Sequence, residues 1–212
     1  MIDIQSDKKK LEQILNKLNS DNAILYDQKE GDYLPKNYTV NCFFRIKDLE
    51  PVHNLIERLK LIDEQQFFYN KEQLHITLLG QIDIKCDKDQ LINTVQNFLD
   101  NNNIKFKLFG VGSSLKVASV TAYPVDFEMD KFRSEIRGLG GGTAYDPPYE
   151  ELGWINIMRY LKKPTVKLLN AFKSETDTDF GLVSPESILL LENSSRLLIG
   201  AREVHRFSLK RD

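Results

Sequence analysis

A histidine and a threonine stand two residues apart inside an apolar stretch of the chain, Gln73 to Gln81. The apolar residues of this stretch predict a β-strand that is at least half buried. Alternate side chains of a strand leave the same face, so we expect His75 and Thr77 to project together. An imidazole exchanges protons near neutral pH, and a hydroxyl donates hydrogen bonds to phosphoryl or carbonyl oxygens. The pair is therefore a candidate for acid–base chemistry, although a structural strand histidine fits the same three residues.

The segments around this strand predict a chain in which short strands alternate with single helices. Further strands are expected at residues 23–26, 38–46, 104–111, 115–122, 153–160, 180–183, 187–191 and 204–209. Helices are expected at residues 7–18, 48–61, 89–100, 126–136 and 164–172. Asp126 is expected to cap the fourth helix, and Pro164 is expected to begin the fifth.

This order of elements predicts an α+β fold with helices outside an antiparallel or mixed sheet. We expect residues 1–212 to form a single two-lobed domain, with residues 1–36 as a helical extension packed on it. The glycine run at residues 138–142 lacks the sequence context of a phosphate-binding loop and predicts a mobile or tightly turning segment.

Composition and charge narrow the class of protein. A chain of 212 residues with 41% hydrophobic and 28% charged residues can bury a good core. The net charge of −2 argues against a broad, charge-driven nucleic-acid surface, but it allows a local phosphate pocket. We find neither a bilayer-spanning apolar run nor a signal peptide, and we expect a cytoplasmic protein without a membrane partner. Cys42 and Cys86 have no metal-ligand or disulfide spacing, so we expect both to be reduced, with Cys42 in the core.

Several of these segments together resemble a known family. They are the strand 38–46, the motif Leu74-His75-Ile76-Thr77-Leu78, the hairpin 106–122, the helix 132–139 and the tail 187–196. From about Tyr38 onward the chain resembles the two-histidine (2H) phosphoesterases, which include RNA 2′,5′-ligase-like proteins and 2′,3′-cyclic nucleotide phosphodiesterases. The resemblance implies two lobes that present one His-x-Thr/Ser motif each across a central cleft, with no metal or other cofactor.

The second motif of this resemblance is altered. The family often reads His-x-Thr-x-x-Arg there, and the corresponding stretch runs from Trp154 to Arg159. Matching on the arginine puts Trp154 at the histidine position and Asn156 at the threonine position. A shift by two residues puts Asn156 at the histidine position instead. Neither alignment supplies a second histidine.

The resemblance implies that His75 is the retained general acid or base and that Thr77 donates to the phosphate. Trp154, Asn156 and Arg159 are then expected to contact the substrate, which is a nucleotide or an RNA terminal phosphate. An indole and an amide do not shuttle protons, and losing one general acid or base typically costs about 10²–10⁴-fold in rate.

The sequence therefore leaves three possibilities open. These are a weak or altered 2′,3′-cyclic phosphodiesterase, an enzyme with another proton donor, and a non-catalytic nucleotide- or RNA-end-binding module. Side chains that are candidates for the missing proton donor are His53, Tyr145, Tyr149, Glu150, Glu151 and His205. We expect His53 to be solvent-exposed and His205 to be structural, whereas Trp154 either stacks on a base or packs in the interior. A purely structural interaction domain is the weakest hypothesis, because it gives His75 and Thr77 no reason to share a face.

Overall fold

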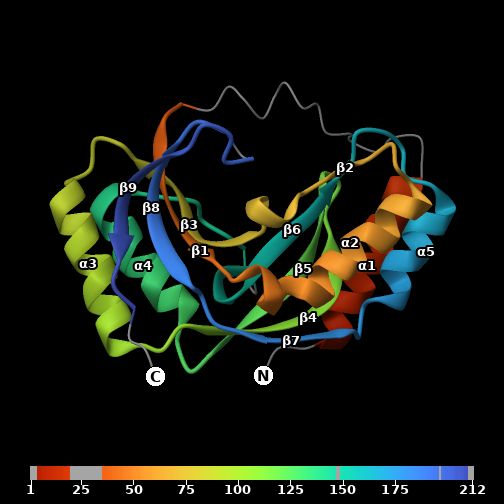
Figure 1. The fold of residues 1–212 in the computed structure, drawn as a ribbon, viewed down its shortest axis with the longest axis horizontal. Helices are drawn as coiled ribbons and strands as arrows, with labels where there is room; N and C mark the ends of the chain where they lie inside the picture. The colour runs from red at the N-terminus through yellow and green to blue at the C-terminus, as the bar shows by residue number, and fades with distance from the viewer. Residues whose placement is uncertain (1–3, 20–34, 147–148, 196, 210–212) are drawn as a thin grey trace.

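The computed structural model describes residues 4–19, 35–146, 149–195 and 197–209, which form an α+β protein as predicted (Figure 1). Its α-helices are α1 (Ile4–Asn19), α2 (Glu50–Ile62), α3 (Lys88–Asn101), α4 (Met129–Gly140) and α5 (Val166–Ser174). Its strands are β1 (Asn37–Phe43), β2 (Phe67–Phe68), β3 (His75–Asp83), β4 (Lys105–Ser113), β5 (Val117–Val125), β6 (Gly153–Arg159), β7 (Asp179–Val183), β8 (Ser187–Asn193) and β9 (Arg202–Phe207). Short 3-10 helices are η2 (Ile46–Leu49), η3 (Lys71–Gln73) and η4 (Tyr149–Glu151). No helix within the described ranges is both long and apolar enough to cross a membrane.

All strands of the described residues join one antiparallel sheet, in the order β7-β4-β5-β6-β3-β1-β8-β9, and β2 also pairs with β6. The pairing between β3 and β6 consists of a single residue pair, Ile76 with Ile155. By contrast, β4 and β5 pair along most of their lengths. We call the β3–β6 junction, formed by this isoleucine pair and the residues that flank it, the seam. It joins two halves of the sheet, β7-β4-β5-β6 and β3-β1-β8-β9.

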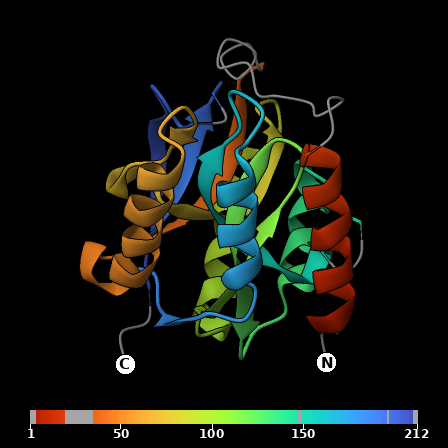
Figure 2. The ribbon, with the colours of Figure 1, turned by 90° about the vertical axis from the view of Figure 1, so that its right-hand side faces the viewer.

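The helices lie at opposite ends of the sheet. Helices α3 and α4 pack together at one end, and α1, α2 and α5 lie at the other (Figure 1). The view turned by 90° shows these last three helices side by side (Figure 2). Leu11, Leu15 and Leu18 on one side of α1 are buried, so the N-terminal helix packs on the body as its apolar spacing predicts.

The two strands of the seam approach each other very closely. Ile76 and Ile155 are fully buried there. A Cβ atom built on Gly153 would lie 2.8 Å from Cγ2 of Ile76 and 3.5 Å from both Ala122 and Met129. A residue without a side chain is therefore required where β6 enters the seam.

The predicted strands are present with small shifts at their ends, and the order of predicted elements from residue 37 onward is observed. Strand β2 was not predicted, because two residues are too short to show a period. The expected strand at residues 23–26 lies outside the described residues. Cys42 is fully buried, and burial raises the pKa of its thiol. Both cysteines are free, as expected.

The predictions for two helix starts were wrong. The N-cap of α4 is Glu128, and Asp126 lies before it with a φ of 64° in the left-handed region. The N-cap of α5 is Thr165, whose hydroxyl accepts a hydrogen bond from a backbone N–H, so Pro164 precedes the helix. A hydroxyl that satisfies a free backbone donor fixes this start better than proline, which only restricts φ.

We predict that Gly153→Ala lowers the free energy of unfolding by about 1–3 kcal/mol, because the new methyl group overpacks the seam. Adding Ile76→Leu, which removes the facing Cγ2, should recover part of the loss and appear as coupling in a double-mutant cycle. Urea unfolding followed by circular dichroism measures both effects.

Gly138→Ala is the matched control for this substitution. Nothing lies within 4 Å of a Cβ added at Gly138, so alanine should stabilise α4 by about 0.5–1 kcal/mol. A Gly153→Ala protein as stable as the wild type would show that the seam tolerates a side chain.

Candidate functional site

Strand β3 begins with His75, directly after η3. Asn70 and Gln73 close η3 with reciprocal capping hydrogen bonds, which fix the chain just before the histidine. The imidazole is only 9% exposed, and its Nδ1 lies 2.7 Å from the Gln73 carbonyl oxygen. A carbonyl oxygen only accepts, so Nδ1 carries a hydrogen and the neutral ring has its lone pair on Nε2. Nε2 has no hydrogen-bond partner among the described residues and is available to a ligand.

The surroundings of His75 favour its neutral form. Burial lowers the pKa of His75 below its ordinary value of 6.5, because a charged ring loses hydration there. The hydrogen bond to the Gln73 carbonyl raises the pKa, and the positive charge of Arg159 lowers it again. At pH 7 the ring is therefore a neutral base.

Thr77 takes part in a short hydrogen-bond chain with β1. Its hydroxyl donates to Oδ1 of Asn41 at 2.8 Å, and Nδ2 of Asn41 donates to the Thr39 hydroxyl at 2.6 Å. Asn41 is fully buried. The Thr77 proton is thus engaged, and the hydroxyl donates to a ligand only if it releases Asn41. The sequence signal for this hydrogen-bond chain is the alternation of Thr39 and Asn41 with apolar residues, which places both polar side chains on one face of β1.

The strand pairing at the seam determines which residues of β6 lie opposite the predicted motif. Extending the pairing by one residue on either side of the isoleucine pair places His75 opposite Asn156 and Thr77 opposite Trp154. All four side chains leave the sheet face opposite the buried isoleucines. The local two-fold axis of an antiparallel pair relates His75 to Trp154 and Thr77 to Asn156.

The two β6 residues that face the motif have different surroundings. Oδ1 of Asn156 is buried and has no hydrogen-bond partner among the described residues. The indole of Trp154 is half-buried and packs edge-on against Tyr145, with ring centroids 5.1 Å apart. Trp154 is thus held in place from one side, and Asn156 has an amide with unused bonding capacity.

Arg159 ends β6 and is 6% exposed. Its Nε donates to the hydroxyl of buried Tyr69 at 2.6 Å. Its charge acts on the pKa of His75, as described above, so the guanidinium lies within electrostatic reach of the imidazole. The five site residues predicted from the sequence are therefore collected at the seam and its ends.

Arg133 of α4 was not predicted as a site residue. It is fully buried, and its Nε donates to the Leu78 carbonyl at 2.7 Å. Its Nη1 donates to the carbonyls of Tyr149 and Glu150, at 2.9 and 2.7 Å. The guanidinium also lies 4.4 Å from the Tyr145 ring centre. Arg133 thereby ties β3, next to Thr77, to the segment that leads into β6.

The sequence did contain a signal for Arg133, because this residue stands among the apolar residues on the buried side of α4. Met129, Phe132 and Ile136 share that side. A buried side chain of this kind needs partners for its donors. Those of Nε and Nη1 come from distant segments, and Nη2 has no partner among the described residues.

The two other histidines lie on β9 and α2, outside the strands of the seam. His205 lies in β9 opposite Leu190, so it faces away from the His75 side, and it packs on Phe207 with centroids 4.8 Å apart. His53 of α2 was expected to be exposed, but it is half-buried, because α2 turns this residue partly toward the body.

The loop residues before β6 divide into engaged and exposed groups. Glu150 forms an ion pair with Arg137, and Glu151 and Tyr149 are exposed. Burial raises the pKa of Tyr145, which therefore keeps its proton at neutral pH. No three His, Cys, Asp or Glu side chains among the described residues are grouped so as to hold a metal ion.

Comparisons with known proteins give a likeness of fold. No family model matches the chain, and no curated protein matches it. A conserved protein of unknown function from Agrobacterium tumefaciens, ATU0111, is 14% identical, with a TM-score of 0.55, over 92% of this chain and 97% of that one. The Thermus thermophilus protein TT0787 is also 14% identical, with a TM-score of 0.52, over 82% of this chain and 98% of that one. At this identity the likeness concerns the fold alone.

We predict that the pKa of His75, measured by NMR titration of its ring protons, lies below 6.5. Arg159→Met should raise it, because removing a nearby cation stabilises the imidazolium. Arg159→Lys keeps the charge and should leave the pKa close to that of the wild type. Arg58→Met, at a largely exposed position, is the control. An unchanged pKa of His75 in Arg159→Met would show that the charge of Arg159 does not act on the imidazole.

Proposed function

We propose that this chain is a 2H phosphoesterase-like protein with one intact motif, which takes the 2′,3′-cyclic phosphate of a nucleotide or an RNA end and opens it weakly. The observation that carries the proposal is the neutral imidazole of His75, with a free Nε2 beside Thr77, facing Asn156 across the seam. The positive charge of Arg159 near this imidazole suits a phosphoryl group.

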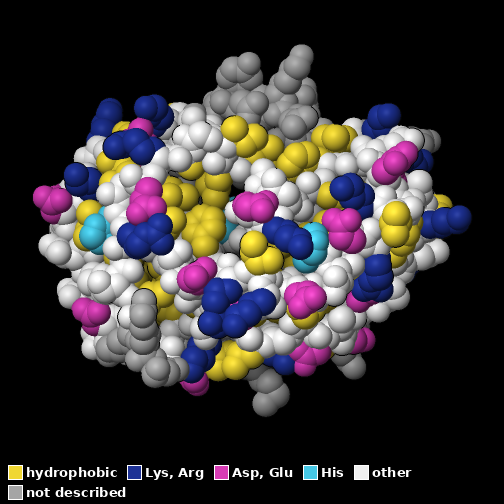
Figure 3. All heavy atoms as spheres, in the orientation of Figure 1, with side chains coloured by type: hydrophobic (Ala, Val, Ile, Leu, Met, Phe, Trp, Pro, Cys, Tyr) yellow, Lys and Arg dark blue, Asp and Glu magenta, His cyan; other side chains and the backbone are white. Residues whose placement is uncertain are grey.

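The arrangement of the sheet supports the same proposal. The two halves of the sheet, with helices at its opposite ends, fit the two-lobed 2H architecture (Figure 1). In the same orientation the molecular surface is hollowed near the middle, and hydrophobic side chains line much of the hollow (Figure 3). A ligand that enters a hollow of this kind is shielded from water, which strengthens its polar contacts.

In the proposed reaction Nε2 of His75 accepts a proton from a water molecule as the water oxygen bonds to phosphorus. The bond from phosphorus to one ribose oxygen breaks, and that oxygen takes a proton from solvent. Asn156 and Arg159 contact the phosphoryl oxygens, where negative charge builds up. The side chains facing the motif, Trp154 and Asn156, do not titrate, so the leaving oxygen lacks a positioned acid. A deficit of about 10²–10⁴-fold against a two-histidine site follows.

We predict that the purified protein slowly opens 2′,3′-cyclic AMP to a nucleoside monophosphate, as measured by chromatography of the products. His75→Ala should abolish the reaction, whereas His205→Ala should not change it. Because the base is neutral His75, the rate should fall as the pH drops through the pKa of His75 and should level off above it. Full activity in His75→Ala would remove this residue from the mechanism.

Restoring the second motif is a stronger test of the proposed symmetry. We predict that Trp154→His combined with Asn156→Thr raises the rate by up to about 10²–10⁴-fold, because it supplies the missing acid at the symmetry-related position. Asn156→His alone, which follows the shifted alignment, should give a smaller gain. Trp154→Phe is the control for loss of the indole. Equal rates in all three variants would argue against the two-histidine architecture.

The second candidate function is a non-catalytic module that binds a nucleotide or an RNA end. The absence of a titratable side chain opposite His75 among the described seam residues favours it. It predicts that 2′,3′-cyclic AMP changes the fluorescence of Trp154, the single tryptophan of the chain, and is recovered unchanged. A flat titration together with no binding by calorimetry would reject this candidate.

A further inference from the structure

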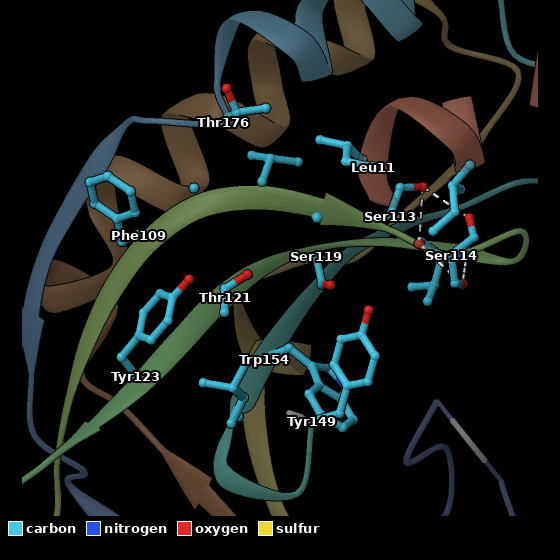
Figure 4. A pocket seen from close by; sticks show the side chains of 17 residues that line it. Leu11, Phe109, Ser113, Ser114, Ser119, Thr121, Tyr123, Tyr149, Trp154 and Thr176 are labelled. Atoms are coloured by element: carbon cyan, nitrogen blue, oxygen red, sulfur yellow. Dashed lines mark hydrogen bonds between the residues drawn. The ribbon is translucent and has the colours of Figure 1, made fainter. Parts of the chain in front are cut away.

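A cavity of about 390 Å³ lies on the half of the sheet formed by β4, β5 and β6. Trp154 of β6 lines it, together with Ser119 and Thr121 of β5 and Phe109 of β4 (Figure 4). Helix α1 contributes Leu11 to its wall. In the strand order, β6 separates this cavity from β3, which carries the predicted motif. The cavity is thus next to the seam and distinct from the position of His75.

The wall of the cavity is uncharged. None of the 17 described residues that line it is Lys, Arg, Asp or Glu, although 28% of the chain is charged. A phosphate placed there would lose its hydration without gaining a charged partner. The size falls within the range of small-molecule sites, so the occupant is a neutral group of limited size.

Two hydroxyl groups of the wall are unused. Ser119 and Thr121 are two apart on β5 and pair with Asn156 and Trp154 of β6, and their hydroxyls have no hydrogen-bond partner among the described residues. Figure 4 shows Tyr123, Thr121 and Ser119 one after another along β5. An aliphatic occupant would leave these hydroxyls without partners, whereas a ring with polar edges would satisfy them.

The aromatic face in the cavity is braced from outside. The ring of Tyr145 packs edge-on against Trp154, and the guanidinium of Arg133 lies 5.7 Å from the indole centre. A braced indole is a stacking platform that loses little freedom when a ring binds.

We propose that this cavity binds an uncharged heteroaromatic ring of the nucleobase type, stacked on Trp154 and hydrogen-bonded by Ser119 and Thr121. The inference deepens the proposed function: the phosphate of the substrate stays at the seam, and its base crosses β6 into the cavity. Binding of the ring by itself needs no phosphate and no catalysis.

Gly112 provides a variant that fills the cavity. A Cβ added there would lie 3.7 Å from Oγ1 of Thr121, at ordinary contact distance, so a larger side chain would extend toward the hydroxyls. Gly112→Leu therefore blocks the cavity at little cost to the backbone. Gly138→Leu, where nothing lies within 4 Å of the added Cβ, is the matched control.

The test is calorimetric titration with adenosine, which has the base and no phosphate. Wild type and Gly138→Leu should bind it equally, and Gly112→Leu should bind at least tenfold more weakly. Trp154→Ala should lose about 5–150-fold, as expected for one stacked base. Thr121→Val keeps the shape of the side chain and removes the hydroxyl, so it should also weaken binding of adenosine. It tests the same cavity if Gly112→Leu does not fold.

The outcomes separate this inference from the proposed function. If cyclic AMP is neither bound at the seam nor opened while adenosine still binds, the proposed function fails and the inference stands. If adenosine does not bind, or binds Gly112→Leu and Thr121→Val as tightly as wild type, the inference is wrong. If the cavity binds 1-decanol and not adenosine, its occupant is aliphatic, and the inference is wrong as well.

Discussion

The pairing of Ile76 with Ile155 is the constraint on which the candidate site depends. It is the only residue pair between β3 and β6 in the described sheet, whereas the other neighbouring strands of the main sheet order share longer ladders. Its burial holds His75 and Thr77 on the opposite face, because side chains alternate along a strand. A slip of one residue would turn the imidazole into the core. Gly153 makes the close approach possible, so packing inside the protein fixes the register that the chemistry needs.

Buried guanidinium groups shape the electrostatics around the seam. Arg133 and Arg159 are both buried. Arg133 donates hydrogen bonds to carbonyl oxygens, and Arg159 donates one to the hydroxyl of Tyr69. Burial of a cation is costly unless its donors find partners, and Nη2 of Arg133 has none among the described residues. The positive charge of Arg159 adds to the effect of burial in lowering the pKa of His75, and in the proposed function it also attracts a phosphoryl group. The same positive charge thus favours the neutral form of His75 and the binding of an anionic ligand.

Strand β6 divides the sheet face into two environments. On the β3 side lie a titratable ring and a nearby cation, and on the β5 side lies an uncharged cavity. Trp154 belongs to both, since it stands opposite Thr77 and also lines the cavity. A nucleotide has the same division between a charged phosphate and a neutral base, which is why we connect the two environments through one ligand.

Local patterns were enough to predict most of the elements. The alternation in β3 and the helical spacing in α1 and α3 placed these elements within a few residues of their bounds. The predicted start of α4 was wrong because Asp126 adopts a φ of 64° in the left-handed region, and the helix begins after Glu128, which makes no side-chain capping hydrogen bond. Arg133 escaped prediction because its partners, Leu78 and Glu150, are far from it in the chain.

The sequence by itself determined which residues of β3 share a face, because the two-residue period of a strand is a local property. It also determined that the stretch from Trp154 to Arg159 contains no histidine in either alignment. Only the tertiary structure decided which residues face that motif. The pairing of β3 with β6 is a contact between segments about 80 residues apart, and it relates His75 to Trp154 through the isoleucine pair. The cavity beyond Trp154 likewise exists only because β4, β5, β6 and α1 are packed together.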